Sequence, residues 1–213
     1  VRTIVSISGQ DSGEILSMME SLSALGVETV EINLSCPNVH RDRPMISQSA
    51  RLTGQLLRDV KREFGQVFVI AKLSPNVTDI SEIAIAAEEG GADGLSMINT
   101  VRGLCVDIEG RRIIEGGYSG PPVKPVGLRA VYDVYRKVRV PIIGIGGIEK
   151  GRDALEYILA GAYAVGVGSG FFSNPFLTSE ICGELKDYMV KNNFRRVTDI
   201  SGMLNEKNYK TGR

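Results

Sequence analysis

The residues best suited to chemistry lie in one short segment, where Asn33 and Asn38 flank Cys36 directly after an apolar run. Amide side chains donate and accept hydrogen bonds, and a thiol becomes a base or nucleophile when its pKa is lowered. Pro37 removes one backbone donor and stiffens the turn. These residues alone leave two interpretations open: a buried cysteine among turn-forming asparagines, or a polar clamp around a reactive thiol.

Further polar residues end two later apolar runs. Lys72 lies near the end of the run 67–73, where a cation removed from water needs an anionic partner. It could also form a Schiff base with a substrate carbonyl, or extend into solvent. Asn99 and Thr100 supply amide and hydroxyl groups after the next run, or simply form a turn. The chain has one histidine and no cysteine spacing typical of a metal site, so no metal is expected.

Two glycine turns late in the chain are suited to phosphate binding. Gly146-Gly147 and Gly168-Ser169 each follow an apolar run and precede a predicted helix. Without a side chain, glycine lets backbone N–H groups approach an anion closely at a helix start. The phosphate would belong either to a substrate or to flavin mononucleotide (FMN).

The elements that must position these residues are six apolar runs alternating with helical patterns. Continuous Val, Ile and Leu are typical of parallel strands buried on both faces, which indicates an α/β fold. Strands are predicted at residues 3–7, 29–34, 67–73, 94–98, 141–145 and 164–167. Helices are predicted from Asp11 or Ser12 to Gly26, from Ser47 to Gly65, from Asp79 to Gly90, and over 126–138, 151–160 and 175–191.

The positions of the glycine turns favour a (β/α)8 TIM barrel over a doubly wound sheet. A doubly wound nucleotide domain carries its glycines after the first strand, whereas barrels bind phosphate after strands seven and eight. We therefore expect residues 1–191 to form strands three to eight of a barrel, followed by a polar tail at 192–213. The abrupt start at Val1 suggests that two βα units are missing. Thr100–Lys124 is predicted to be a long loop, of the kind that forms lids or binding loops.

Composition narrows the class of partner and the compartment. The 25 basic residues balance the 25 acidic ones, which argues against nucleic acid or an anionic membrane as partner. No apolar stretch approaches the roughly 20 residues that span a bilayer. Three cysteines without a disulfide pattern suit the reducing cytoplasm.

Six motifs resemble the flavin-dependent dihydroorotate dehydrogenases over Ile4 to about Leu185. They are INLSCPNV at 32–39, AKLSPNVTDI at 71–80, INT at 98–100, YSGPPVKPVGLR at 118–129, IIGIGGI at 142–148 and VGVGSG at 165–170. The resemblance implies FMN-dependent oxidation of dihydroorotate to orotate in pyrimidine biosynthesis. It makes Cys36 the base that takes a proton from C5 while hydride leaves C6 for flavin N5.

The resemblance also implies ligand sets and a branch of the family. The implied substrate ligands are Asn33, Asn38, Asn99 and Thr100, and the implied FMN ligands are Ser6, Asn33, Lys72, Ile98, Gly120, Gly146, Gly147, Gly168 and Ser169. Ser6 stands where NAD-linked members usually carry asparagine. Cys36 implies the soluble branch, and KLSPNVTDI resembles its NAD-linked catalytic subunit, which works in a homo- or hetero-oligomer with an electron-transfer subunit carrying FAD and an iron–sulfur cluster.

Three other functions remain as alternatives. Dihydropyrimidine dehydrogenases share KLSPNVTDI but keep their acid–base cysteine beyond the turn, where residues 39–50 here contain none. A phosphate-binding barrel lyase or isomerase could use Lys72 on a sugar phosphate. A non-catalytic binding module would need neither Cys36 nor flavin.

Overall fold

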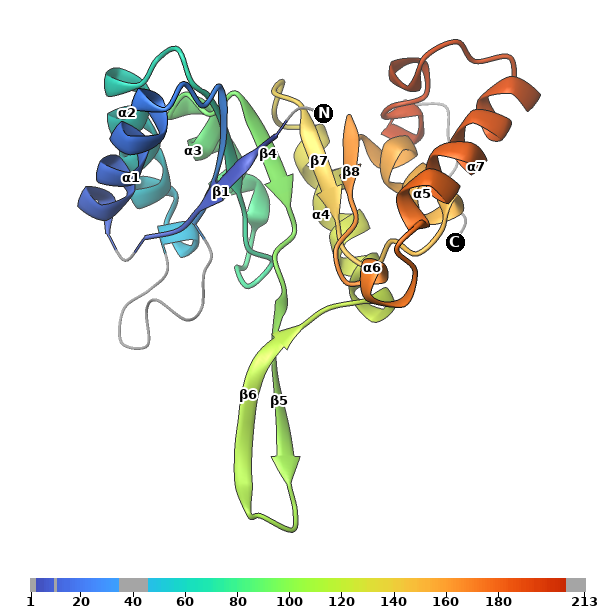
Figure 1. The fold of residues 1–213 in the computed structure, drawn as a ribbon, viewed down its shortest axis with the longest axis horizontal. Helices are drawn as coiled ribbons and strands as arrows, with labels where there is room; N and C mark the ends of the chain where they lie inside the picture. Colours follow the sequence, from blue (N-terminus) through green and yellow to red (C-terminus); the bar gives the residue numbers. More distant parts are fainter. Residues whose placement is uncertain (1–2, 10, 35–45, 206–213) are drawn as a thin grey trace.

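A parallel six-stranded sheet forms the centre of the chain, in a computed structural model that describes residues 3–9, 11–34 and 46–205 (Figure 1). The strand order is β1-β2-β3-β4-β7-β8. The strands are β1 (Val5–Ile7), β2 (Thr29–Asn33), β3 (Phe68–Lys72), β4 (Gly94–Met97), β7 (Ile142–Ile145) and β8 (Ala164–Gly166). Each predicted strand is therefore present, and the curved sheet is part of a barrel, as expected.

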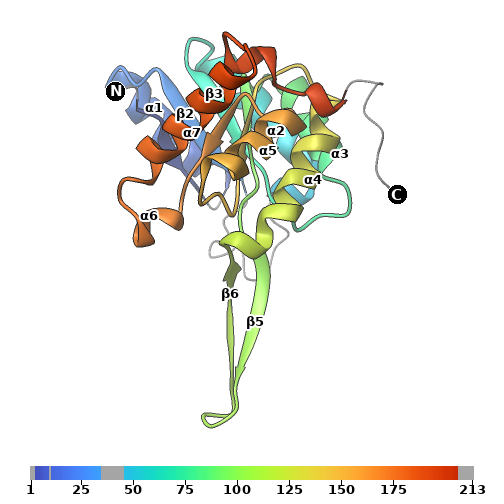
Figure 2. The same cartoon turned by 90° about the vertical axis from the view of Figure 1, so that its right-hand side faces the viewer.

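Helices pack along the outside of this curved sheet (Figures 1 and 2). They are α1 (Ser12–Ala24), α2 (Ala50–Glu63), α3 (Ile80–Glu89), α4 (Lys124–Tyr135), α5 (Gly151–Ala160), α6 (Gly170–Ser173) and α7 (Leu177–Lys191), with short 3-10 turns η1 (Ile46–Gln48) and η2 (Pro121–Val123). Asp11 and Asp79 cap α1 and α3, as predicted from their short acceptor side chains. The cap predicted at Ser47 is wrong. Ser49 accepts the hydrogen bond from Leu52 N instead, because Ser47 is buried in η1.

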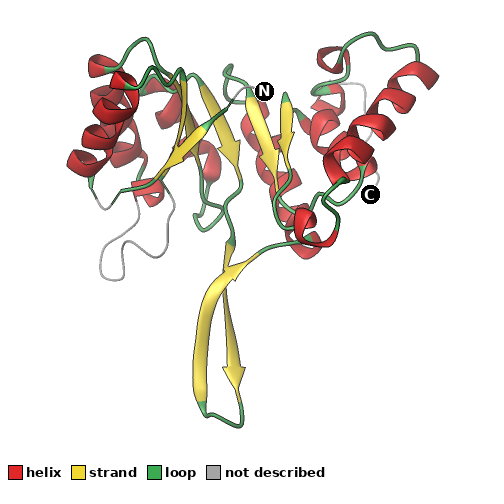
Figure 3. Cartoon of the chain, viewed as in Figure 1, coloured by secondary structure: helices red, strands yellow, loops and turns green. Residues whose placement is uncertain are grey.

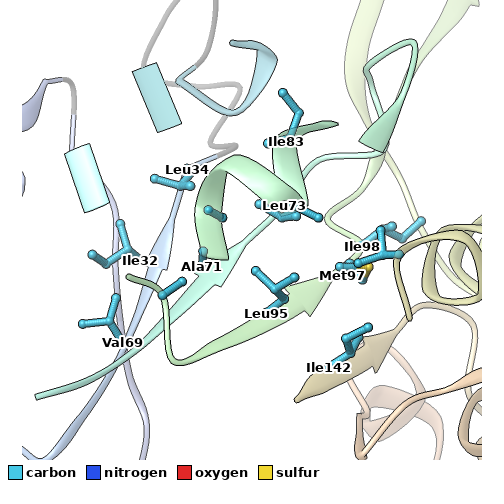
Figure 4. Close-up of a cluster of buried hydrophobic side chains, with 14 of the residues drawn as sticks. Ile32, Leu34, Val69, Ala71, Leu73, Ile83, Leu95, Met97, Ile98 and Ile142 are labelled. Atoms are coloured by element: carbon cyan, nitrogen blue, oxygen red, sulfur yellow. The ribbon is translucent and has the colours of Figure 1, made fainter. Parts of the chain in front are cut away.

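The apolar core lies between the sheet and the helices. Along β2, Val30 and Ile32 are fully buried, whereas Glu31 and Asn33 alternate with them and point to the opposite face. Figure 4 shows Ile32 near Val69 and Ala71 on the neighbouring strand β3, with Leu95 beyond them on β4. Burying apolar side chains on the outer face leaves the inner face of β2 free to carry polar groups.

Residues 101–118 form a long hairpin, which corrects the prediction of a loop over Thr100–Lys124. Strands β5 (Val101–Asp107) and β6 (Arg112–Tyr118) pair antiparallel along their whole length. The hairpin projects away from the sheet (Figure 3). Asp107 fixes its turn by accepting from Gly110 N at 3.0 Å and Arg112 Nε at 2.7 Å. The sequence signal for this turn was an Asp three residues before a Gly, between two runs rich in branched residues.

Residues beyond α7 pack against the barrel segment in the part that the structure describes. Two further 3-10 turns, η3 (Val197–Asp199) and η4 (Met203–Asn205), follow α7. Ile200 is fully buried, Ser201 Oγ donates to Ala162 O at 3.0 Å, and Asn205 Nδ2 donates to Ala160 O at 2.6 Å. Among the described helices, none has the length and apolar character needed to cross a membrane.

Candidate active site

The carboxyl ends of the strands surround a cavity of about 170 Å³. Parallel strands place their carboxyl ends on one side of a sheet, which is where α/β barrels carry their active sites. The predicted site residues that line the cavity are Lys72, Ile98, Asn99, Thr100, Gly120, Gly146, Gly147, Gly168 and Ser169. The structure therefore brings together residues from five separate parts of the sequence. Cys36 and Asn38 lie outside the described residues.

Asn33 joins this group through a direct contact. Asn99 Nδ2 donates to Asn33 Oδ1 at 3.2 Å, and Asn99 Oδ1 accepts from Thr100 N at 2.8 Å. Asn33 also pairs in register with Lys72 on the neighbouring strand. Two amides and one ammonium thus lie side by side at the ends of β2, β3 and β4, an arrangement suited to a planar ligand with several carbonyl and N–H groups.

Ser6 lies away from the cavity lining and has a different partner within the described structure. Its hydroxyl donates to Glu31 Oε1 at 2.9 Å. Glu31 also accepts from Ser96 Oγ at 2.6 Å and lies 3.7 Å from Lys72 Nζ. Sequence reasoning missed Glu31. The available signal was its position two residues before Asn33, which in a strand places both side chains on the same face.

Tyr157 makes a hydrogen bond to the first glycine turn, Gly146-Gly147. This fully buried side chain of α5 donates from Oη to Gly146 O at 2.9 Å. Burial raises the pKa of the phenol, so it stays a neutral hydrogen-bond donor. A Cβ added at Gly144 would lie 2.5 Å from the Tyr157 ring, so the strand approaches the tyrosine as only glycine allows. Sequence reasoning treated Tyr157 only as part of a helix.

A partly buried ion pair holds the starts of α4 and α5 together beside the same turn. Lys124 Nζ donates to Asp153 Oδ1 at 2.6 Å and lies 2.8 Å from Glu156 Oε2. The hydrogen bond to Asp153 raises the pKa of Lys124. Burial opposes ionisation of Asp153, yet the hydrogen bonds from Lys124 and from Glu149 N hold its pKa below the usual range. Because Lys124 is engaged by two carboxylates, it serves mainly to fix the turn.

Gly120 and Gly168 leave bare backbone facing open space, whereas Gly146 and Gly147 are needed for their backbone conformation. Gly146 and Gly147 have φ values of +129° and +66°, which L side chains rarely adopt. A Cβ built at Gly120 or Gly168 would meet no atom within 4 Å, whereas one at Gly147 would lie 2.8 Å from Gly120 O. Side chains at Gly120 and Gly168 would extend into this open space. Among the described residues, no cluster of His, Cys, Asp and Glu could hold a metal ion.

Together, the barrel sheet and the polar strand ends define an α/β-barrel enzyme with a cavity suited to a phosphate-bearing organic ligand. A sequence profile described as dihydroorotate dehydrogenase matches residues 1–189. The chain belongs to the dihydroorotate dehydrogenase family.

Relatives with curated names give the branch of the family. The catalytic subunit of dihydroorotate dehydrogenase B (NAD(+)) from Lachnoclostridium phytofermentans is 43% identical over 205 residues, which cover 94% of this chain and 68% of the relative. The same subunit from Desulforamulus reducens is 45% identical over 204 residues, 93% of this chain and 67% of the relative. The chain thus spans about two thirds of the length of these relatives.

A solved structure agrees with the fold. The crystal structure of the Eimeria tenella dihydroorotate dehydrogenase in complex with ferulenol superposes with a TM-score of 0.75 at 26% identity, over 88% of this chain and 57% of that one. The likeness supports the interpretation of the six-stranded sheet as part of a TIM barrel.

Proposed function

We propose that this chain carries the catalytic site of an NAD-linked dihydroorotate dehydrogenase, which oxidises dihydroorotate to orotate in pyrimidine biosynthesis. One observation supports the proposal most strongly: Asn33–Asn99, Lys72 and two glycine turns meet at one end of the sheet. Membership of the dihydroorotate dehydrogenase family, matched over residues 1–189, supports assigning this arrangement to dihydroorotate oxidation.

FMN is the cofactor that fits these residues. When bound, FMN accepts the hydride that leaves C6 of dihydroorotate. Gly146, Gly147, Gly168 and Ser169 would hold its phosphate, because all four line the cavity and the backbone of Gly168 borders open space. Lys72 would lie against the ring and favour its reduced, anionic form. Ile98 N–H already donates to Ile145 O at 3.1 Å, so Ile98 would contact FMN through its carbonyl.

The substrate ligands and the base would be supplied by residues that follow β2 in the sequence and by residues at the end of β4. Asn33, Asn38, Asn99 and Thr100 would hydrogen-bond the pyrimidine ring. Cys36 would take the proton from C5, and the electron pair of that C–H bond would form the C5=C6 double bond as hydride leaves C6. The hydrogen bond between the Asn33 and Asn99 amides holds these two groups together at the strand ends.

Electrons would leave through a second protein. Relatives of this chain are named catalytic subunits, which implies at least one other subunit in those enzymes. We propose an electron-transfer subunit carrying FAD and an iron–sulfur cluster, and therefore a hetero-oligomer. The free, exposed thiols of Cys105 and Cys182 suit a reducing cytoplasm, where we place the enzyme.

The test uses the whole protein with FMN under anaerobic conditions. Dihydroorotate should bleach the flavin absorbance of the unaltered protein, and Cys36→Ala should bind FMN but lose nearly all of this bleaching near neutral pH. Cys105→Ala is the matched control, because it removes an exposed thiol on the hairpin. A protein that binds no FMN, or a Cys36→Ala variant that is reduced at the original rate, would refute the proposal.

In the lyase or isomerase alternative, Lys72 would form a Schiff base with a sugar phosphate. Schiff-base chemistry needs a neutral amine and would break the ion pair with Glu31. Trapping of the protein by borohydride in the presence of a sugar phosphate would support that alternative, and we expect no such trapping.

A further inference from the structure

Glu31 places a carboxylate on the inner face of the sheet, beside the candidate site. Its side chain is 13% exposed, and that of its partner Lys72 is 21% exposed. Removing a carboxylate from water costs several kcal/mol unless hydrogen bonds and opposite charge compensate it. The carboxylate of Glu31 must therefore be compensated by hydrogen bonds or by opposite charge nearby.

Two serines on other strands hold the carboxylate. Ser6 of β1 donates to Oε1 at 2.9 Å, and Ser96 of β4 donates to Oε2 at 2.6 Å. Ser6 is in register with Glu31, and Ser96 is in register with Lys72. Side chains from four strands, β1 to β4, therefore interact at one position of the sheet. Each carboxylate oxygen thus has a hydroxyl donor that does not involve Lys72, and the position of Glu31 is fixed independently of the lysine.

Lys72 is bound more loosely than Glu31. Its ammonium lies 3.7 Å from Glu31 Oε1, beyond the usual range of a direct hydrogen bond but within ion-pair range. Lys72 also lines the cavity. Within the described part of the chain, no hydrogen bond engages the N–H groups of its ammonium, so they remain available to a ligand in the cavity while Glu31 attracts the charge.

We propose that Glu31 is a positioning residue, which holds the Lys72 ammonium at the cavity wall and offsets part of its charge. This inference rests on the proposed function, because its effect falls on bound FMN. An uncompensated lysine stabilises anionic reduced flavin strongly. A lysine paired with a carboxylate stabilises it less, so the pair lowers the reduction potential of the flavin.

The test measures the flavin midpoint potential of the whole protein by equilibration with a redox dye. Glu31→Gln keeps the size and the acceptor oxygen but removes the charge. We expect reduced FMN to bind about tenfold more tightly relative to oxidised FMN, because one nearby charge is removed. For a two-electron couple, tenfold corresponds to a rise of about 30 mV. The affinity for oxidised FMN should change by less than about threefold, because that form carries no ring charge.

Asp93→Asn is the matched control. Asp93 also pairs with a lysine, at 2.8 Å from Lys61 Nζ, but it precedes β4 at the opposite end of the sheet. This variant should lose stability and leave the midpoint potential unchanged. Glu31→Asp keeps the charge on a shorter side chain and should fall between the unaltered protein and Glu31→Gln. If Glu31→Gln cannot be purified, the midpoint potential of Glu31→Asp tests the role of Glu31.

The outcomes separate the two proposals. Absence of FMN binding by the unaltered protein would refute the proposed function itself. Normal FMN binding with a change below about twofold in both Glu31 variants, or a lowered potential in Glu31→Gln, would overturn the role of Glu31 alone. An equal shift in Asp93→Asn would also overturn it, because the effect would then follow from general loosening.

Discussion

The carboxyl end of the sheet and the β5–β6 hairpin are built in opposite ways. At the strand ends, polar side chains of β2 reach across β3 to partners on or just after β4, as Asn33 does with Asn99 and Glu31 with Ser96. On the hairpin, Leu104, Val106 and Ile113 are more than half exposed. The backbone ladder and the Asp107–Arg112 pair hold the hairpin together. Figure 1 shows how far this arm extends from the sheet.

This difference predicts where substitutions matter. A side chain in the sheet is constrained by several strands at once, so one change disturbs many contacts. A side chain on a two-stranded ribbon has few neighbours to lose. Asn76 links the two regions, because its Nδ2 donates to Thr100 O at 3.0 Å and its Oδ1 accepts from Arg102 N at 2.9 Å.

Leu95→Ala should give the largest loss of stability. Leu95 is fully buried between the sheet and the helices, so its truncation leaves a cavity (Figure 4). We expect the free energy of unfolding to fall by about 3 kcal/mol. Urea unfolding followed by circular dichroism measures it, and a loss below about 1 kcal/mol would contradict the packing described for this face.

Asp153→Asn should cost about 2 kcal/mol at neutral pH, because it leaves Lys124 without its closest partner. The lowered pKa of Asp153 means that its contribution is present at neutral pH and is lost as pH falls through the folded-state pKa. The raised pKa of Lys124 means that its contribution is lost only at strongly alkaline pH.

The pH dependence is the control for this variant. Unfolding curves of the variant and the unaltered protein should differ by a constant amount between about pH 5 and 9, and converge at lower pH. A difference that persists undiminished in acid would mean that the ion pair is not its cause.

Tyr157→Phe should cost about 1 kcal/mol, because Gly146 O loses its donor while the ring still fills its site. We also expect weaker FMN binding, by about threefold to tenfold, because the phosphate turn becomes less rigid. Calorimetric titration of the apoprotein with FMN measures this effect. An unchanged affinity would show that the turn needs no support from the tyrosine.

Ile113→Ser should have the smallest effect. Its side chain on the hairpin is 65% exposed, so we expect a change within about 0.5 kcal/mol in the free energy of unfolding. A loss comparable to that of Leu95→Ala would break the comparison, because it would place the hairpin within the cooperative core.

The strands of the sheet could be predicted from the sequence, whereas side-chain contacts between distant segments could not. Continuous apolar runs identified every described strand of the sheet, and the glycine turns were correctly placed after β7 and β8, because these signals are local. The hairpin was missed because Gly103, Gly116 and Gly117 interrupt its alternation. Glu31, Tyr157 and the Lys124–Asp153 pair were missed because their roles depend on neighbours far away in the sequence.

Much of the candidate site could be predicted from the sequence, because most of its residues lie at or just after the end of a strand. Lys72 lies near the end of a predicted strand, and Asn99 and Gly146 each follow one, so the fold alone brings them to one end of the sheet. Ser6 could not be assigned in this way. Its place in the first strand does not reveal that Glu31, in register beside it, engages its hydroxyl.

The most direct test of the account is anaerobic mixing of the whole FMN-loaded protein with dihydroorotate. We predict that the flavin absorbance bleaches as orotate forms in equal amount, and that Cys36→Ala retains FMN but bleaches negligibly near neutral pH. A flavin that remains oxidised in the unaltered protein, or a Cys36→Ala variant that forms orotate at the original rate, would contradict the account.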